Sequence, residues 1–292
     1  MMRVILIFLT LISSVIFIPF AHADETLPVV EFSDMRRSGQ GEVADVLSPV
    51  TILMKDGTII RLVGIDVPGM YKDDASVMAV TARDILRDLL AGQRVEIYQT
   101  TDKNSGLVNR MGQQLAHLKL AKGGFWAQGV LLKLGLARVK TTAANAHMAD
   151  KMLVIERAAR EEKIGIWAND AYGVVSADNA ESAVGNFAIV EGRIQSVALK
   201  KNRLYINFGK NWRHDFTVSI APEDKRAFSN ARLDPMRWGR KRVRVRGSVR
   251  DYNGPYMEIT HPGAIEFLDD DIALPEDAPR EDALPQYVAP PQ

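Results

Sequence analysis

Five short stretches rich in β-branched and apolar residues follow one another in the C-terminal half of the chain, and they constrain the fold more than any other feature. They predict strands over residues 188–198, 203–208, 215–220, 242–250 and 255–260. A polar stretch that begins with Pro222, residues 222–231, favours a helix between the third and fourth strands. Five strands with a helix in this place are the order of an OB-fold barrel.

The N-terminal half predicts a second mixture of strands and helices. Two apolar stretches, residues 43–55 and 58–66, flank Lys55-Asp56-Gly57, a tight-turn signal, and therefore predict a β-hairpin. A helix is expected over residues 75–91, with Asp73 or Asp74 as its N-cap. Further strands and helices are predicted over residues 94–101, 114–120, 125–134 and 145–163. Strands mixed with helices in this order indicate the α+β class.

The start of the chain predicts export. Residues 4–20 carry no charge, and Ala21-His22-Ala23 offers a small-x-small cleavage site, so residues 1–23 are expected to be a signal peptide and the protein to be periplasmic or secreted. The alternative is an uncleaved membrane anchor, because the apolar run is close to the shortest spanning length. No later run is long enough to span a bilayer, so no stable membrane insertion is expected after cleavage.

Several kinds of chemistry are excluded or disfavoured by composition. The chain has no cysteine, which excludes disulfides, thiolate metal sites and a cysteine nucleophile. Its five histidines show no paired metal-ligand spacing, which disfavours a zinc site. Neither a G-x-S-x-G motif nor a P-loop is present.

The charge distribution divides the remaining chain into segments. A small and polar stretch, residues 169–184, predicts a linker between a first domain (residues 41–168) and a second (residues 185–268). Residues 185–268 carry 16 Lys and Arg against 8 Asp and Glu, a net charge of +8. Residues 269–292 are acidic, with a net charge of −6, and rich in proline, so they predict a disordered tail. Such a tail can cover the basic domain and compete with an anionic ligand.

Several motifs of the first domain resemble, in one order, those of the thermonuclease family: RLVGIDVP, TARDILRDLLAGQRVEI, GQQLAHLKL, LLKLGLARV and ERAAREEKIGIW. The resemblance implies an OB barrel with packed helices and a calcium-dependent phosphodiesterase activity. It also implies that two aspartates hold calcium, that a glutamate after the GID-x-P turn activates water, and that two arginines stabilise the charge on phosphorus. A hard cation, a carboxylate base and fixed cations suit that chemistry.

Matched to this chain one at a time, those roles are mostly lost. Arg61 and Asp66 stand where the family has its first arginine and its second metal-binding aspartate. Val50 replaces the first metal-binding aspartate, Gly69 the glutamate and Gln113 the second arginine. The resemblance therefore implies an OB-fold domain with a degenerate active site, in which Asp66 is the metal ligand, and calcium the ion, if any metal is bound.

Neighbouring residues leave some alternatives open. Arg110 stands three residues before Gln113, but strand alternation would turn it to the other face. Asp73 and Asp74 either supply a carboxylate to the same cleft or cap the following helix. Arg61 and Asp66 form either a structural ion pair in the barrel mouth or a vestigial substrate contact.

The second domain predicts a surface for polyanions. Arg242, Arg244 and Arg246 alternate with valines, so they share one face of a strand while the valines face the core. A row of cations on a barrel face can follow a phosphate backbone. Aromatic residues at 205, 208, 212 and 216 either stack on bases or fill the core. The candidate polyanion-binding residues are Lys200, Lys201, Arg203, Arg240, Lys241, Arg242, Arg244 and Arg246. The second domain also resembles the OB-like domain that follows thermonuclease-like domains in some exported bacterial proteins.

Three functions are compatible with these observations. The favoured one is an exported module of the cell envelope that binds nucleic acid or another anionic polymer and is catalytically impaired. The second is a calcium-dependent phosphodiesterase with a divergent active site. The third is an envelope module that binds other proteins.

Overall fold

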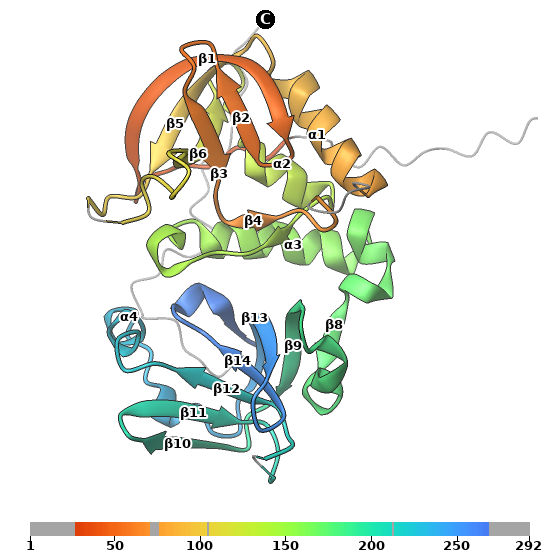
Figure 1. Cartoon of the computed structure of the whole chain (residues 1–292), viewed down its shortest axis with the longest axis vertical. Coiled ribbons are helices and arrows are strands. Elements are labelled where there is room, and N and C mark those ends of the chain that lie inside the picture. Colours follow the sequence, from red (N-terminus) through yellow and green to blue (C-terminus); the bar gives the residue numbers. More distant parts are fainter. Residues whose placement is uncertain (1–26, 71–75, 104, 212, 269–292) are drawn as a thin grey trace, which may run out of the picture.

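The computed structural model describes residues 27–70, 76–103, 105–211 and 213–268 (Figure 1). The expected signal peptide, Asp73, Asp74, Trp212 and the acidic tail lie outside these residues. No helix within the described ranges is long and apolar enough to cross a bilayer.

The first domain is built on a closed barrel in the order β1-β2-β3-β6-β5. The strand β1 is long and bent, so its N-terminal half pairs with β5 and its C-terminal half with β2. The strands β3 and β6 close the barrel in parallel, and every other pair in it is antiparallel. Its strands are β1 (Arg36–Ser48), β2 (Thr51–Met54), β3 (Ile59–Leu62), β5 (Arg94–Gln99) and β6 (Gln114–Leu120).

The predicted hairpin is confirmed at its turn but wrong in the length of its strands. The pairing of β2 with β3 flanks Asp56-Gly57, as expected. The first stretch is interrupted at Pro49, so it forms the end of β1 and all of β2. The second stretch leaves the barrel at Gly64, whose φ is +82°. Asp66 therefore lies in a separate short strand, β4 (Ile65–Asp66), which pairs with β7 (Arg138–Val139).

Three helices pack on the barrel, close to the positions predicted. They are α1 (Val77–Leu90), α2 (Ala127–Lys133) and α3 (Ala149–Glu161). The expected N-cap of the first helix was wrong, because the hydroxyl of Ser76 accepts the hydrogen bond from the Ala79 amide at 3.2 Å. A serine oxygen here satisfies an amide that the helix itself leaves unbonded. The 3-10 helices of the described residues are η1 (Ala143–Asn145), η2 (Gly165–Ala168), η3 (Asp170–Tyr172), η4 (Ala177–Ala183), η5 (Pro235–Arg237) and η6 (Pro262–Ala264).

The second domain repeats the strand order of the first. Its sheet runs β10-β11-β12-β14-β13-β9-β8, and β15 pairs with β13. The predicted strand at residues 188–198 is broken near Gln195 into β9 and β10. When β9 and β10 are counted as one bent strand, the strand order is the same as in the first barrel. The pair of β12 and β14 is parallel, as is the pair of β3 and β6. The remaining elements are β8 (Val174–Ser176), β9 (Phe187–Arg193), β10 (Ser196–Lys200), β11 (Arg203–Asn207), β12 (Thr217–Ile220), α4 (Lys225–Asn230), β13 (Arg242–Asp251), β14 (Pro255–Glu258) and β15 (Ile265–Phe267).

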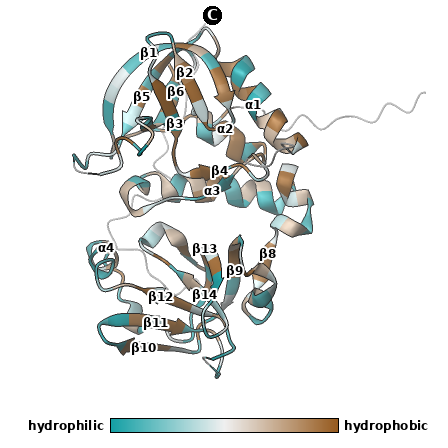
Figure 2. Cartoon of the chain, viewed as in Figure 1, coloured by the Kyte–Doolittle hydropathy of each residue, from teal (hydrophilic) through white to brown (hydrophobic). Residues whose placement is uncertain are grey.

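Much of the segment expected as a linker belongs to the second domain. The strand β8 pairs in parallel with β9, and Ala180 and Ala183 of η4 are buried in the second core. The helix α3 lies between the two barrels (Figure 1). A small cluster joins the domains there, in which Ala159, Ile166 and Trp167 pack with Ile189 of β9. Hydrophobic residues otherwise concentrate on the barrel strands and on β4 (Figure 2).

Candidate functional site

Asp66, the retained metal-binding position, is occupied by two cations of the protein itself. Asp66 and Arg138 are directly opposite in the β4–β7 pair, so their side chains meet across the two strands. Nε and Nη2 of Arg138 both lie 2.9 Å from Oδ2 of Asp66, and Nζ of Lys140 lies 3.5 Å from Oδ1. The side chains of Asp66 and Arg138 are each only 14% exposed. Asp66 forms a structural ion pair, as one alternative expected, but the partners found are Arg138 and Lys140, whereas the expectation had named Arg61.

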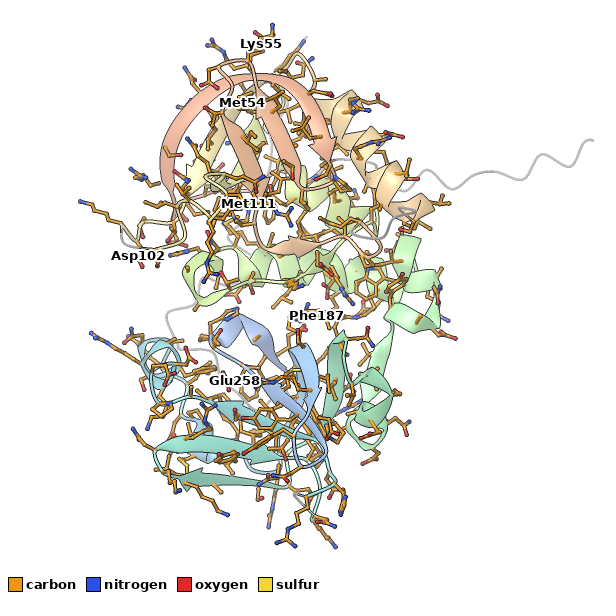
Figure 3. The ribbon with its side chains drawn as sticks, in the orientation of Figure 1. Met54, Lys55, Asp102, Met111, Phe187 and Glu258 are labelled. Carbon is orange, nitrogen blue, oxygen red and sulfur yellow. The ribbon has the colours of Figure 1, made fainter. Side chains whose placement is uncertain are left out.

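The same ion pair holds the second domain in place. Nη1 of Arg138 donates to the backbone oxygen of Phe187 at 3.2 Å, and its guanidinium lies 4.5 Å from the centre of the Phe187 ring. Nζ of Lys140 lies 5.3 Å from the same ring centre. Figure 3 shows Phe187 at the junction between the two domains. Asp66 thus orients two cations that contact the first residue of β9.

Val50 stands where a calcium site would need a second carboxylate. Its side chain is fully buried in the first core, and its carbonyl accepts the amide of Leu62 at 2.8 Å. An apolar, buried position offers no oxygen ligand and no solvent path for a hydrated ion.

Gly69 occupies a turn that no glutamate fits without change. Its φ is +80°, a conformation that costs a side-chain-bearing residue about 1–2 kcal/mol. A Cβ at this position would lie 2.6 Å from Oγ of Ser76, which itself donates to the backbone oxygen of Pro68 at 3.0 Å. The backbone and the helix cap both oppose a catalytic carboxylate here.

Gln113 closes a turn instead of facing a phosphate. Its side-chain oxygen accepts from Nδ2 of Asn109 at 2.8 Å, and its amide donates to Oδ1 of Asn109 at 3.1 Å. Arg110 lies exposed in the same turn, before the first residue of β6. Arg61 is half-buried on β3 and is paired in register with Thr51 and Leu115.

These positions do not fit a calcium ion. Both carboxylate oxygens of Asp66 are bonded to cations of the protein, and the side chain of Val50 has no ligand atom. Gly69 and Gln113 supply neither a base nor a charge. Across the described parts of the chain, no three His, Cys, Asp or Glu side chains gather closely enough to hold a metal.

A buried charge network lies at the other end of this junction. Arg246 is only 4% exposed. Its Nη1 lies 3.0 Å and 3.1 Å from the two carboxylate oxygens of Glu156 on α3, and its Nη2 lies 2.5 Å from Oε1 of Glu266. Glu156 also accepts from the amide of Val139 and from Arg160. Burial alone would raise the pKa of Glu266, but Arg246 and Arg157 outweigh it and hold that pKa below its usual value.

Some of the candidate polyanion-binding residues form ion pairs in the structure, and some lie exposed on the surface. Val243 and Val245 are buried and the alternating arginines share the opposite face, but carboxylates meet that face. Arg246 bonds to Glu156 and Glu266, so it has no surface to offer. Arg242 and Arg244 are both bonded to Glu191, and Arg203 is bonded to Glu258. Of the remaining candidates, Lys200, Lys201 and Arg240 are exposed and Lys241 is half-buried.

The second domain has a surface hollow that the sequence did not predict as a unit. It has a volume of about 420 Å³. Tyr205 lines it, whereas Phe208 and Phe216, the other described candidates for stacking, are buried in the core. Its further lining residues are Ala198, Lys200, Asn207, Thr217, Tyr252, Asn253 and Tyr256.

Comparison with known proteins agrees with the geometry of the first domain. No curated protein matches the chain. The sequence model of the family described as Staphylococcal nuclease homologue matches residues 59–169, from β3 to the residue that follows η2. The chain therefore contains a domain of the staphylococcal nuclease family, matched over residues 59–169; its closed five-stranded barrel of the OB type also includes β1 and β2, and a second, sheet-rich domain follows it.

Proposed function

We propose that the protein is an exported binding module of the cell envelope, which holds nucleic acid or another anionic polymer and has lost the chemistry of its family. A domain of the staphylococcal nuclease family supports a nuclease-like or nucleic-acid-binding module. The observation that carries this proposal is the Asp66 carboxylate, whose two oxygens are bonded to Arg138 and Lys140.

Loss of catalysis follows from the kinds of group that are missing. Phosphodiester cleavage of this type needs a cation to polarise the phosphate and a base to activate water. Val50 removes one metal ligand, and Arg138 neutralises the other. Gly69 removes the base. Removal of one charge-stabilising group typically costs about 10² to 10³ in rate, so three unlike losses leave little activity.

Binding is supported by the charge of the second domain. Residues 185–268 carry a net charge of +8. Lys200, Lys201 and Arg240 are exposed on this domain. Clustered cations bind polyanions through release of counterions, without a need for catalytic groups.

Export is supported by the first residues of the sequence. The uncharged run at residues 4–20 and the Ala21-His22-Ala23 site that follows it are typical of a cleaved signal peptide.

A cleavage assay with a binding assay tests this function. Plasmid and single-stranded DNA are incubated with the protein, with and without calcium, and retention of labelled DNA and heparin is measured at low salt. We expect retention without cleavage. Retention should strengthen when residues 270–292, nearly all of the acidic tail, are deleted. The deleted residues include six acidic side chains and one basic side chain.

Two results would favour the other functions. Calcium-dependent cleavage that Asp66→Ala abolishes would identify a working phosphodiesterase. Failure to retain any polyanion, with or without the tail, would favour a protein-binding module.

A further inference from the structure

The hollow of the second domain lies on the outer face of its sheet. Tyr205 is directly opposite Ala198 on β10, and Asn207 is opposite Thr217 on β12. Thr217 is in turn opposite Tyr256 on β14. Because side chains alternate along a strand, these residues share one face, while Leu204, Ile206 and Val218 point to the core. The turn that follows β13 adds Tyr252 and Asn253 at the rim.

Its aromatic rings are held in defined positions. The hydroxyl of Tyr256 is 2.5 Å from Oγ of Ser219, and the Tyr256 ring meets the Tyr252 ring edge-on at 5.3 Å between centres. Tyr252 is 62% exposed, whereas Tyr256 is buried at 5% exposed. The guanidinium of Arg250 lies 5.4 Å from the centre of the Tyr256 ring. Tyr252 is therefore the exposed ring of the pair, and Tyr256 supports it from below, which offers a flat ligand one ring to stack on.

Cations lie at the same hollow. Lys200 lines it and is exposed, and Lys201 follows in the turn. Glu258, also labelled in Figure 3, is a carboxylate on this face, and it lies 2.5 Å from Arg203 and 3.8 Å from Arg250. Asp224 lies close enough to interact electrostatically with both Glu258 and Arg203. Arg203, Arg250, Lys200 and Lys201 therefore stand against the carboxylates of Glu258 and Asp224.

We infer that this hollow binds a single-stranded nucleic acid, with one base against Tyr205 and Tyr252, above the buried Tyr256, and the flanking phosphates toward Lys200 and Lys201. The exposed side chain of Asn253 supplies a hydrogen-bond donor and an acceptor for the edge of the base, whereas Thr217 donates to Asn207 and Asn207 donates to Ser196. The hollow is within the roughly 300–1,000 Å³ range of small-ligand sites. In a duplex the bases are stacked inside, so a single strand is the form that can reach these rings. This inference rests on the proposed function and gives it a site and a ligand.

The test measures binding of the full chain to a fluorescein-labelled oligodeoxythymidine of 12 nucleotides, by fluorescence anisotropy at low salt. Tyr252→Ala should weaken binding by about 5-fold or more, because one stacked base contributes about 1–3 kcal/mol. Tyr252→Phe, which keeps the ring, should bind like the parent protein. Lys200→Ala should lower the slope of log K against log salt by about 0.7, whereas Lys122→Ala, an exposed lysine of the first domain, should leave the slope unchanged.

The outcomes separate this inference from the proposed function. If the oligonucleotide binds and Tyr252→Ala, Tyr205→Ala and Lys200→Ala all bind equally well, the site is elsewhere and only the inference fails. If a neutral oligosaccharide displaces the oligonucleotide, the hollow is a sugar site and the inference is wrong. If neither the oligonucleotide nor heparin binds the parent protein, the proposed function fails as well. Circular dichroism of each variant checks that it is folded.

Discussion

The two barrels of this protein follow the same strand order, yet their polar residues serve different ends. In the first barrel the retained carboxylate of Asp66 is bonded to Arg138 and Lys140, which contact Phe187 of the second domain. In the second barrel the outer sheet face is lined by tyrosines and Lys200 and is hollow. In the first domain these charges join two domains, whereas we propose that the rings and cations of the second bind a ligand.

This difference shows how a shared fold can be separated from a shared function. In each domain the third strand pairs in parallel with the fifth, β3 with β6 and β12 with β14. This pairing belongs to the fold and does not indicate a chemical activity. What differs is the place of the polar side chains. Asp66, on β4 outside the first barrel, meets the other domain, whereas the sheet face that carries Tyr205 in the second domain meets solvent. Each prediction below asks whether that division is real.

The largest expected effect concerns the buried network that joins the barrels. Arg246→Ala leaves Glu156 and Glu266 without their shared cation in a buried site, so the free energy of unfolding should fall by about 3–5 kcal/mol. Urea unfolding measures the change. Arg242→Ala, on the same strand but 56% exposed, is the matched control and should cost less than about 1 kcal/mol. Equal costs for the two variants would contradict a charged junction.

Asp66→Asn tests whether the retained carboxylate holds the junction. The variant removes the anion that Arg138 and Lys140 share, and it should lower the free energy of unfolding by about 2 kcal/mol. Hydrogen exchange should also become faster in β9, which begins at the Phe187 that Arg138 contacts. Asp45→Asn, which breaks an exposed pair with Arg87, serves as the control and should cost clearly less, because solvent screens that pair. A stable Asp66→Asn protein with unchanged exchange would show that the pair is incidental.

Acid should weaken the same junction through His261. Burial lowers the pKa of His261 to about 4 from its usual 6.5, and its Nε2 lies 2.7 Å from Oγ1 of Thr141 in the first domain. Between these values the unfolded chain takes up a proton that the folded chain does not. Stability is therefore complete above pH 6.5 and falls as the pH drops toward 4.

Thermal and urea unfolding at pH 7 and pH 5 measure this effect. The contribution of His261 to the loss is about 2 kcal/mol, since one pKa unit corresponds to about 1.4 kcal/mol. His261→Asn should remove that part of the pH dependence. A remaining slope is expected from His117, whose pKa burial lowers to about 3. An unchanged slope in His261→Asn would contradict the assignment.

The smallest expected effect concerns the turn at Gly69, the position at which the family resemblance places the catalytic glutamate. Gly69→Ala places a Cβ in a left-handed conformation, so it should cost about 1 kcal/mol. Gly57→Ala, also at positive φ but with open space around the added Cβ, separates the backbone strain from the contact with Ser76. A stabilised Gly69→Ala protein would show that a side chain is tolerated where the family has its glutamate.

Most strands of both domains could be predicted from the sequence, because apolar alternation and turn residues are local signals, whereas the closed barrel of the first domain was implied by the resemblance of its motifs. The alternation of arginine and valine in β13 also predicted correctly which residues share a face. It could not show that α3 supplies Glu156 to that face, because residues 156 and 246 meet only in the folded chain. Asp66 and Arg138 are 72 residues apart and meet through strands of two residues each, too short to leave a pattern. The hollow was missed because Tyr252 lies in a turn and Tyr205 and Tyr256 on strands that are separate in the sequence.

The most direct test of the central claim is the effect of calcium on thermal unfolding. A metal that binds the folded state raises the melting temperature with its concentration. Because Asp66 is bonded to Arg138 and Lys140, we expect calcium at millimolar concentration to leave the melting temperature of the parent protein unchanged, while Asp66→Asn melts at a lower temperature with or without calcium. A melting temperature that rises with calcium in the parent protein, and not in Asp66→Asn, would show that this carboxylate still holds a metal.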